Sequence, residues 1–178
     1  MKKIFKIILD YYYKFKKGGV GYAKYKGVQV GKDCRILTSS FGSEPWMITI
    51  GNKVTITSGV RLLTHDGASW LFHDEKGRRH LYRPITIGNS VFIGSNAIIM
   101  PGVIIEDEVI IAAGSVVTKS VPRGKLVGGN PAKIIGNFED YKNKVLNEYT
   151  SDQSIDFLKN YRERVEEIID HEPKSFLK

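Results

Sequence analysis

Aliphatic residues recur at every sixth position through the middle of the chain. From residue 87 the pattern continues through six hexads, whose first positions are Ile87, Ile93, Ile99, Ile105, Ile111 and Val117. Four residues after these stand Val91, Ala97, Val103, Val109, Ser115 and Val121. An upstream copy of the pattern contains Ile50, Ile56 and Leu62, and a weaker start is visible at Val30 and Ile36.

A period of six matches neither an α-helix nor a simple alternating strand. It predicts a short strand, a bend and a second short strand, with glycine and other small residues at the bends. Three such rungs would make a coil of 18 residues, and stacked coils would bury the first-position side chains in one column. A set of β-hairpins is the alternative, but hairpins do not keep one phase over six hexads. The pattern therefore predicts a mainly β solenoid over residues 28–136.

The repeat is interrupted twice. The rung that starts at Leu62 ends at Gly67, and the next regular rung starts at Ile87, so residues 68–86 form an excursion of 19 residues. A shorter break, SSFGSEPW, precedes Ile50. Insertions in a solenoid emerge on one face, which is often the functional one. We therefore expect a protruding loop over residues 68–86 that carries chemistry.

Both ends of the chain are predicted to be helical. Residues 1–27 begin with a basic amphipathic helix, which Gly18 and Gly19 should end. Charged residues within this helix make spanning a bilayer too costly, so residues 1–17 are expected either to pack on the solenoid or another subunit, or to contact an anionic membrane surface peripherally. The helical tail over residues 137–178 is expected to cap the solenoid.

Composition and charge narrow the function. The chain has 178 residues, of which 42% are hydrophobic and 26% are charged, as in a soluble globular domain. The formal charge of +8 is concentrated in residues 1–35, and no nucleic-acid-binding signature is present, which argues against a nucleic-acid partner. The single Cys34 excludes an intrachain disulfide and a cysteine-based zinc cluster. With no cleavable signal or spanning run, we expect a cytoplasmic protein, located at the inner face of the membrane if its first helix binds lipid.

The hexads IGNSVF, IGSNAI, IMPGVI and IAAGSV, together with the ending GSVVTKSVPRGKLVGGNPAKII, resemble the hexapeptide-repeat acyltransferases. Within this family the sequence is most similar to the maltose, galactoside and capsular-polysaccharide O-acetyltransferases, over roughly residues 28–136. The resemblance implies a left-handed parallel β-helix, a homotrimer and acetyl-CoA as co-substrate. It also implies a saccharide acceptor, such as a surface-polysaccharide precursor, and no metal, because the thioester is already activated.

Acetyl transfer to a hydroxyl needs a base that works near neutral pH, for which histidine is suited. His65 stands where an ordered rung gives way to the excursion, so it is the predicted catalytic base, with Asp66 either orienting it or forming an Asx turn. His73 and His80 are alternative bases or acceptor contacts. Trp70 and Tyr82 are predicted to contact the sugar, with packing as the alternative. Glu44 and Trp46, in the upstream break, could line the acceptor pocket.

The resemblance also implies a binding groove for acetyl-CoA along the last regular coils. The residues expected to line it are Ser95, Ala113, Gly114, Thr118 and Lys119, and those expected to meet the phosphates are Arg123, Lys125 and Lys133. Two alternatives to the sugar O-acetyltransferase remain. One is an enzyme of the same fold that acts on an amine, an amino acid or an antibiotic. The other is a non-catalytic or zinc-binding β-helix, which would need histidine ligands spaced across the coils.

Overall fold

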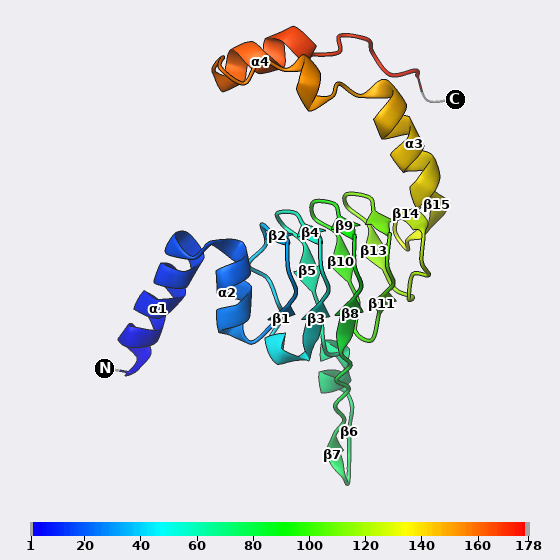
Figure 1. Ribbon diagram of the computed structural model, residues 1–178. Helices are drawn as coiled ribbons and strands as arrows, with labels where there is room; N and C mark the ends of the chain where they lie inside the picture. Colours follow the sequence, from blue (N-terminus) through cyan, green and yellow to red (C-terminus); the bar gives the residue numbers. More distant parts are fainter. Residues whose placement is uncertain (1, 177–178) are drawn as a thin grey trace. The chain divides into compact units, whose positions relative to one another are not determined.

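A computed structural model describes residues 2–176, and the chain divides after Asp140 into two compact units. The first unit contains the N-terminal helices and the solenoid with its excursion (Figure 1). The second unit contains most of the helical tail. Among the described residues, no helix combines the length and the apolar character needed to cross a membrane.

The solenoid has three parallel sheets. Sheet A contains β1 (Gln29–Val30), β3 (Ile48–Ile50), β8 (Ile85–Ile87) and β11 (Ile104–Ile105). Sheet B contains β2 (Arg35–Ile36), β4 (Thr55–Ile56), β9 (Phe92–Ile93), β12 (Ile110–Ile111) and β14 (Lys125–Gly128), and ends in the antiparallel β15 (Lys133–Asn137). Sheet C contains β5 (Arg61–Leu62), β10 (Ile98–Ile99) and β13 (Val116–Val117).

The strand register confirms the predicted period. Phe92 pairs with Ile110, which lies 18 residues further along the chain, as expected for one coil of three rungs. Thr55 pairs with Phe92 across 37 residues, which is one coil plus the 19-residue excursion. Every predicted first-position aliphatic from Ile50 to Val117 is at most 2% exposed. The predicted column is therefore the core of the molecule.

The structure shows where in each hexad the chain bends. Every sixth residue, three after a first-position aliphatic, has a left-handed backbone: Ser90, Asn96, Gly102, Glu108 and Gly114. The glycines one position after those aliphatics have another role. A Cβ on Gly88 would lie 2.4 Å from Oδ1 of Asp107, and one on Gly94 would lie 2.5 Å from the amide nitrogen of Ala113. Glycine at this position allows neighbouring coils to stack closely.

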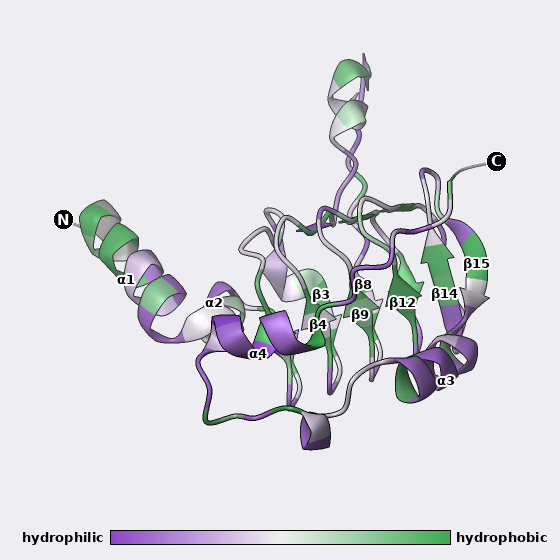
Figure 2. Ribbon diagram, turned by 90° about the horizontal axis from the view of Figure 1, so that it is seen from above, coloured by the Kyte–Doolittle hydropathy of each residue, from purple (hydrophilic) through white to green (hydrophobic). Residues whose placement is uncertain are grey.

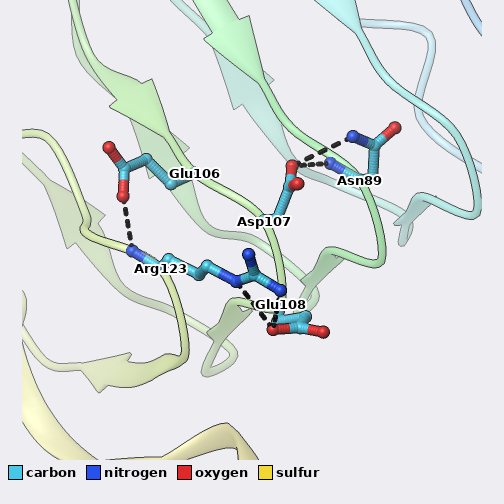
Figure 3. Close-up of polar contacts among 5 residues, drawn as sticks. All are labelled: Asn89, Glu106, Asp107, Glu108 and Arg123. Carbon is cyan, nitrogen blue, oxygen red and sulfur yellow. Dashed lines mark hydrogen bonds and ion pairs between the residues drawn. The ribbon is translucent and has the colours of Figure 1, made fainter.

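The corner between sheets A and B is tied together by side chains of successive coils. Oδ1 of Asn52 accepts from the amide of Lys32 at 2.8 Å, and Oδ1 of Asn89 accepts from the amide of Asn52 at 2.9 Å. Oδ1 of Asp107 in turn accepts from the amide of Asn89 at 2.6 Å (Figure 3). Each of these corner amides lies outside a strand, and a side chain of the next coil supplies its hydrogen-bond acceptor. We call this series the corner ladder.

The N-terminal segment forms two helices, α1 (Lys2–Lys16) and α2 (Gly18–Lys26), where the sequence predicted one. Lys17 lies between them, and Gly18, the first residue of α2, has φ of +67°, so α1 ends beside the predicted glycines but a second helix follows. A Cβ on Gly19 would overlap the carbonyl oxygen of Ile36, at 1.6 Å, so α2 lies directly against β2. Ala23 of α2 is fully buried in the same core. It is therefore α2 that packs on the first coil.

The excursion and the tail follow the prediction with one shift. The excursion contains a short 3-10 helix, η2 (Gly67–Leu71), and a hairpin of β6 (His73–Asp74) and β7 (Gly77–Arg78) that projects from the solenoid (Figure 1). Ile85 and Thr86, counted in the predicted loop, lie in β8 instead. The tail contains α3 (Phe138–Glu148), η3 (Asp152–Ser154) and α4 (Tyr161–Ile168), and its capping role stays a prediction.

Candidate active site

The excursion leaves the solenoid through a short paired stem that carries His65. Thr64, just after β5, is buried, and the amide of Arg83 donates to its carbonyl oxygen at 2.8 Å. His65 forms an antiparallel bridge with Tyr82, and the amide of Asp66 donates to the carbonyl oxygen of Leu81 at 3.1 Å. The departing and returning chains thus hold each other, which fixes the backbone of His65 although its side chain is 38% exposed.

The upstream break of the repeat brings Glu44 to the same place. Phe41 is buried in the core, and the carbonyl oxygen of Leu62 would lie 2.9 Å from a Cβ on Gly42, whose φ is +67°. Pro45 is buried and starts the short helix η1 (Pro45–Met47). The break is therefore pressed against the end of β5, one coil further along, and Glu44 reaches the beginning of the excursion.

Glu44 binds both Thr64 and His65 through one carboxylate oxygen. Oε2 accepts from the Thr64 hydroxyl at 2.6 Å and lies 2.9 Å from Nδ1 of His65. The Thr64 hydrogen bond, assisted by His65, lowers the pKa of Glu44 in spite of its burial, so the carboxylate is ionised at neutral pH. Because a carboxylate only accepts hydrogen bonds, Nδ1 carries the proton and Nε2 is left as the basic nitrogen.

Asp66, the predicted partner of His65, has a different role in the structure. Its carboxylate accepts from the amide of Ala68 at 2.9 Å and caps the start of η2. The Asx-turn alternative therefore describes Asp66, and the carboxylate bound to the imidazole belongs to Glu44. Sequence analysis named Glu44 only as a residue that could line the acceptor pocket.

The other predicted acceptor residues fall into two groups. Tyr82 lies beside His65, with ring centroids 5.9 Å apart, and His80 stacks on Tyr82 at 6.1 Å with 6° between the ring planes. Trp70 and His73 form a separate edge-to-face pair at 6.4 Å. In the part of the chain that is described, no three His, Cys, Asp or Glu side chains are grouped to hold a metal.

The predicted acetyl-CoA residues lie at more than one corner of the solenoid. Ser95, Ala113 and Gly114 share the corner between sheets B and C, where the amide of Gly114 donates to the carbonyl oxygen of Ser95 at 2.8 Å. Thr118 and Lys119 follow β13, at the next corner. Lys119 and Lys133 line one pocket of about 180 Å³, whose lining also includes Val117 and Val121.

Arg123 and Lys125 already have partners within the chain. The guanidinium of Arg123 binds Oε2 of Glu108 at 2.9 Å, and its amide donates to Glu106 at 2.7 Å (Figure 3). Glu108 raises the pKa of Arg123, with smaller contributions from Asp107 and Glu106. Nζ of Lys125 donates to Asn137 at 3.0 Å. The carboxylates of Glu106, Asp107 and Glu108 outnumber the one guanidinium, so the local charge at Arg123 is negative and unfavourable for a phosphate.

Comparison with known proteins identifies the family. A family profile described as the hexapeptide repeat of succinyl-transferase matches residues 84–119. Protein CapG of Staphylococcus aureus is 47% identical over 143 residues, which are 78% of this chain and 80% of that protein. The chain belongs to the hexapeptide-repeat acyltransferases. The predicted resemblance is thereby confirmed, and the chain is an enzyme, an acetyltransferase of this family.

Other members of the hexapeptide-repeat acyltransferases match over shorter stretches or in fold alone. Galactoside O-acetyltransferase of Escherichia coli (strain K12) is 35% identical over 63% of this chain, which spans about half of that protein (55%). Two solved structures, each 24% identical, share the fold. They are a maltose O-acetyltransferase from Clostridium difficile 630 (TM-score 0.53, covering 70% of this chain and 76% of that one) and a galactoside acetyltransferase in complex with coenzyme A (TM-score 0.54, covering 85% and 86%).

Proposed function

We propose that this acetyltransferase transfers the acetyl group of acetyl-CoA to a hydroxyl of a saccharide, with His65 as general base and Glu44 as the residue that positions it. The observation that carries the proposal is the 2.9 Å contact between Nδ1 of His65 and the ionised carboxylate of Glu44. This contact leaves Nε2 able to accept a proton at the exposed start of the excursion.

The reaction proceeds by direct attack. Nε2 of His65 takes the proton of the acceptor hydroxyl while the hydroxyl oxygen attacks the carbonyl carbon of the thioester. The carbon–sulfur bond then breaks, the acetyl ester forms, and the CoA sulfur takes the proton back from the imidazolium. Glu44 holds the ring in place and stabilises the imidazolium while it exists, as a carboxylate does in a Ser-His-Asp triad.

The choice of a sugar acceptor is supported by relatives and by the site. Besides galactoside O-acetyltransferase, a putative lipopolysaccharide biosynthesis O-acetyl transferase, WbbJ of Escherichia coli (strain K12), is 31% identical over 51% of this chain and 50% of that protein. The rings of Tyr82 and His80 next to His65 provide a flat surface on which a sugar ring could stack. We infer a saccharide of the kind that is built into surface polysaccharides.

The cosubstrate site is proposed along the last coils. Ser95, Ala113, Gly114 and Thr118 would line the pantetheine arm. Lys119 and Lys133, which share a pocket, would meet the phosphates. Arg123 and Lys125 are left out because both are engaged within the chain. The homotrimer, with each excursion reaching a neighbouring subunit, the left-handed winding and the cytoplasmic location remain parts of this proposal.

The proposal is tested by measuring CoA release from acetyl-CoA against a panel of saccharides, amino acids and aminoglycosides. We expect turnover with at least one saccharide, an O-acetylated product by mass spectrometry and a rate at least about a hundredfold lower with His65→Ala. Turnover with an amine acceptor alone would identify the alternative enzyme of the same fold. Failure to bind acetyl-CoA at all, by calorimetry, would contradict the proposed reaction.

A further inference from the structure

Among its described side chains, helix α1 contacts α2 through one face. The ring of Tyr13 stacks on Tyr25 of α2, with centroids 4.3 Å apart and 7° between the planes. Asp10 pairs with Lys26 of α2 at 3.6 Å. Leu9, which precedes Asp10 on the same face, is half-buried. Since α2 lies directly on β2, this face of α1 is fixed to the first coil of the solenoid.

The opposite face of α1 is apolar and uncovered. Its residues recur at helical spacing and are between 44% and 66% exposed: Ile4, Phe5, Ile7, Ile8, Tyr11, Tyr12 and Phe15. We call them the α1 apolar face, and their hydropathy is visible along the helix in Figure 2. A surface of this kind on a protein normally marks an interaction site.

The charges around this face favour one class of partner. Residues 1–17 contain six lysines and a single acidic residue, Asp10, which is directed to Lys26 on the attached side. Lys14, Lys16 and Lys17 are exposed at the end of the helix. A second copy of this chain would bring like charges together. An anionic lipid bilayer offers an apolar interior for the face and negative headgroups for the lysines.

We propose that the α1 apolar face docks on an anionic membrane surface, with α1 lying in the plane of the headgroups. The aromatic rings of Tyr11 and Tyr12 suit this depth, because tyrosine has an apolar body and a polar tip. The contact of Gly19 with Ile36 then holds the solenoid at the membrane through its first coil. This inference does not depend on the proposed function, since it involves no residue of the candidate active site.

The test is flotation of the full-length chain with vesicles of phosphatidylcholine alone or mixed with phosphatidylglycerol. We expect binding to the mixed vesicles that weakens as salt is raised. The double variants Ile4→Ser with Ile8→Ser and Lys14→Glu with Lys16→Glu should each lower the partition coefficient at least about tenfold. Matched controls in the second unit, Leu158→Ser with Phe176→Ser and Lys144→Glu with Lys174→Glu, should leave it unchanged.

Three outcomes would overturn the proposal. Equal flotation with neutral vesicles would show that the lysines have no part in binding. Absence of flotation from both kinds of vesicle would show that the face does not meet lipid. A lower mass of the Ile4→Ser, Ile8→Ser variant by light scattering without lipid would show that a second copy covers the face. Circular dichroism of each variant establishes that it is folded before it is compared.

Discussion

The regular coils and the two interruptions of the repeat differ in the kind of side chain that they bring together. In the coils from Ile87 to Val117, each rung places one aliphatic side chain in the column, and the column holds no ionisable group. At the interruptions, a carboxylate, a hydroxyl and an imidazole meet within hydrogen-bonding distance. Glu44 and His65 come from different breaks, and the stacking of successive coils brings them together. The repeat thus supplies a rigid scaffold, and its interruptions hold the residues of the candidate active site.

The largest effect should come from removing the base at the second interruption. Removing a positioned general base lowers the rate by about 10² to 10⁴-fold, so His65→Ala should lose kcat to that extent. Binding of acetyl-CoA and the thermal unfolding midpoint should stay close to those of the wild type. The measurement is kcat at saturating acceptor, because a loop histidine could imitate a base by weakening acceptor binding. If His80→Ala abolishes turnover and His65→Ala does not, the base lies in the excursion itself.

A truncation to alanine in a regular coil, in contrast to His65→Ala, should lower the stability of the fold. Ile93 is fully buried between neighbouring coils, and Ile93→Ala should lower the free energy of unfolding by about 2–5 kcal/mol through lost burial and a cavity. Urea denaturation measures this loss. Phe72→Ala, in the excursion, is the control. Phe72 is 68% exposed, so its loss should cost less than about 0.5 kcal/mol. Equal losses at the two sites would contradict the division of roles.

Changing the positioning residue should affect the reaction less than removing the base. A glutamine at position 44 can donate to Nδ1, which would favour the wrong tautomer of His65. We expect Glu44→Gln to lower kcat by about tenfold to a thousandfold, less than the roughly 10⁴-fold loss for the corresponding change in a buried triad. KM for acetyl-CoA should not change. If kcat is unchanged while KM for the acceptor rises, Glu44 binds the acceptor and does not position the base.

Asp66 and Glu44 are two carboxylates near His65, and comparing their variants shows which of them acts on the imidazole. Because its side chain caps η2, Asp66→Ala should reduce stability by about 1 kcal/mol and change kcat only slightly. Thermal unfolding and steady-state kinetics of this variant check both expectations. A loss of kcat as large as that of Glu44→Gln would mean that Asp66 orients the base after all.

The smallest effect concerns pH. The pKa of Glu44 lies below its ordinary value of 4.5, so its carboxylate stabilises the folded state above that pH. This contribution is lost as the pH falls through the lowered pKa of the folded state. The stability difference between the wild type and Glu44→Gln should therefore be constant at neutral pH and shrink below about pH 4.5. Urea unfolding at several pH values measures it, and a difference that grows on acidification would contradict the assignment.

The sequence predicts the coils well because a single period sorts their residues. Each hexad repeats the same burial, so the column from Ile50 to Val117 could be identified without any long-range information. The same reasoning assigned every glycine to a bend, which holds for Gly102 and Gly114 but not for Gly88 and Gly94, since small size permits both a bend and a close approach. Only the structure, in which a Cβ on Gly88 or Gly94 would collide with the next coil, shows that these two glycines allow close stacking.

The contacts of the candidate site could be anticipated only in part. His65 could be proposed as the base because it stands at a break in phase, and phase is visible in the sequence. Its partner was missed because Glu44 lies 21 residues away, one full coil earlier, while Asp66 is adjacent in the chain. The sequence signal for Glu44 was the earlier break in the repeat, SSFGSEPW. Because successive coils stack, this break lies against the end of β5. Helix α2 was missed for a local reason, since its three glycines suggest a loop until the packing of Gly19 against Ile36 is known.

The corner ladder makes the corner between sheets A and B a poor place for inserted sequence. Surface turns usually accept added residues, because nothing depends on their exact path. Here Asn52, Asn89 and Asp107 each hold the amide of a neighbouring coil, so an insertion at one corner would free hydrogen-bonding groups on two. The tip of the β6–β7 hairpin has no such neighbour, and Gly77 there has open space around it. An engineer who wishes to add a tag or a reporter inside this chain would choose the hairpin tip over the corner between sheets A and B.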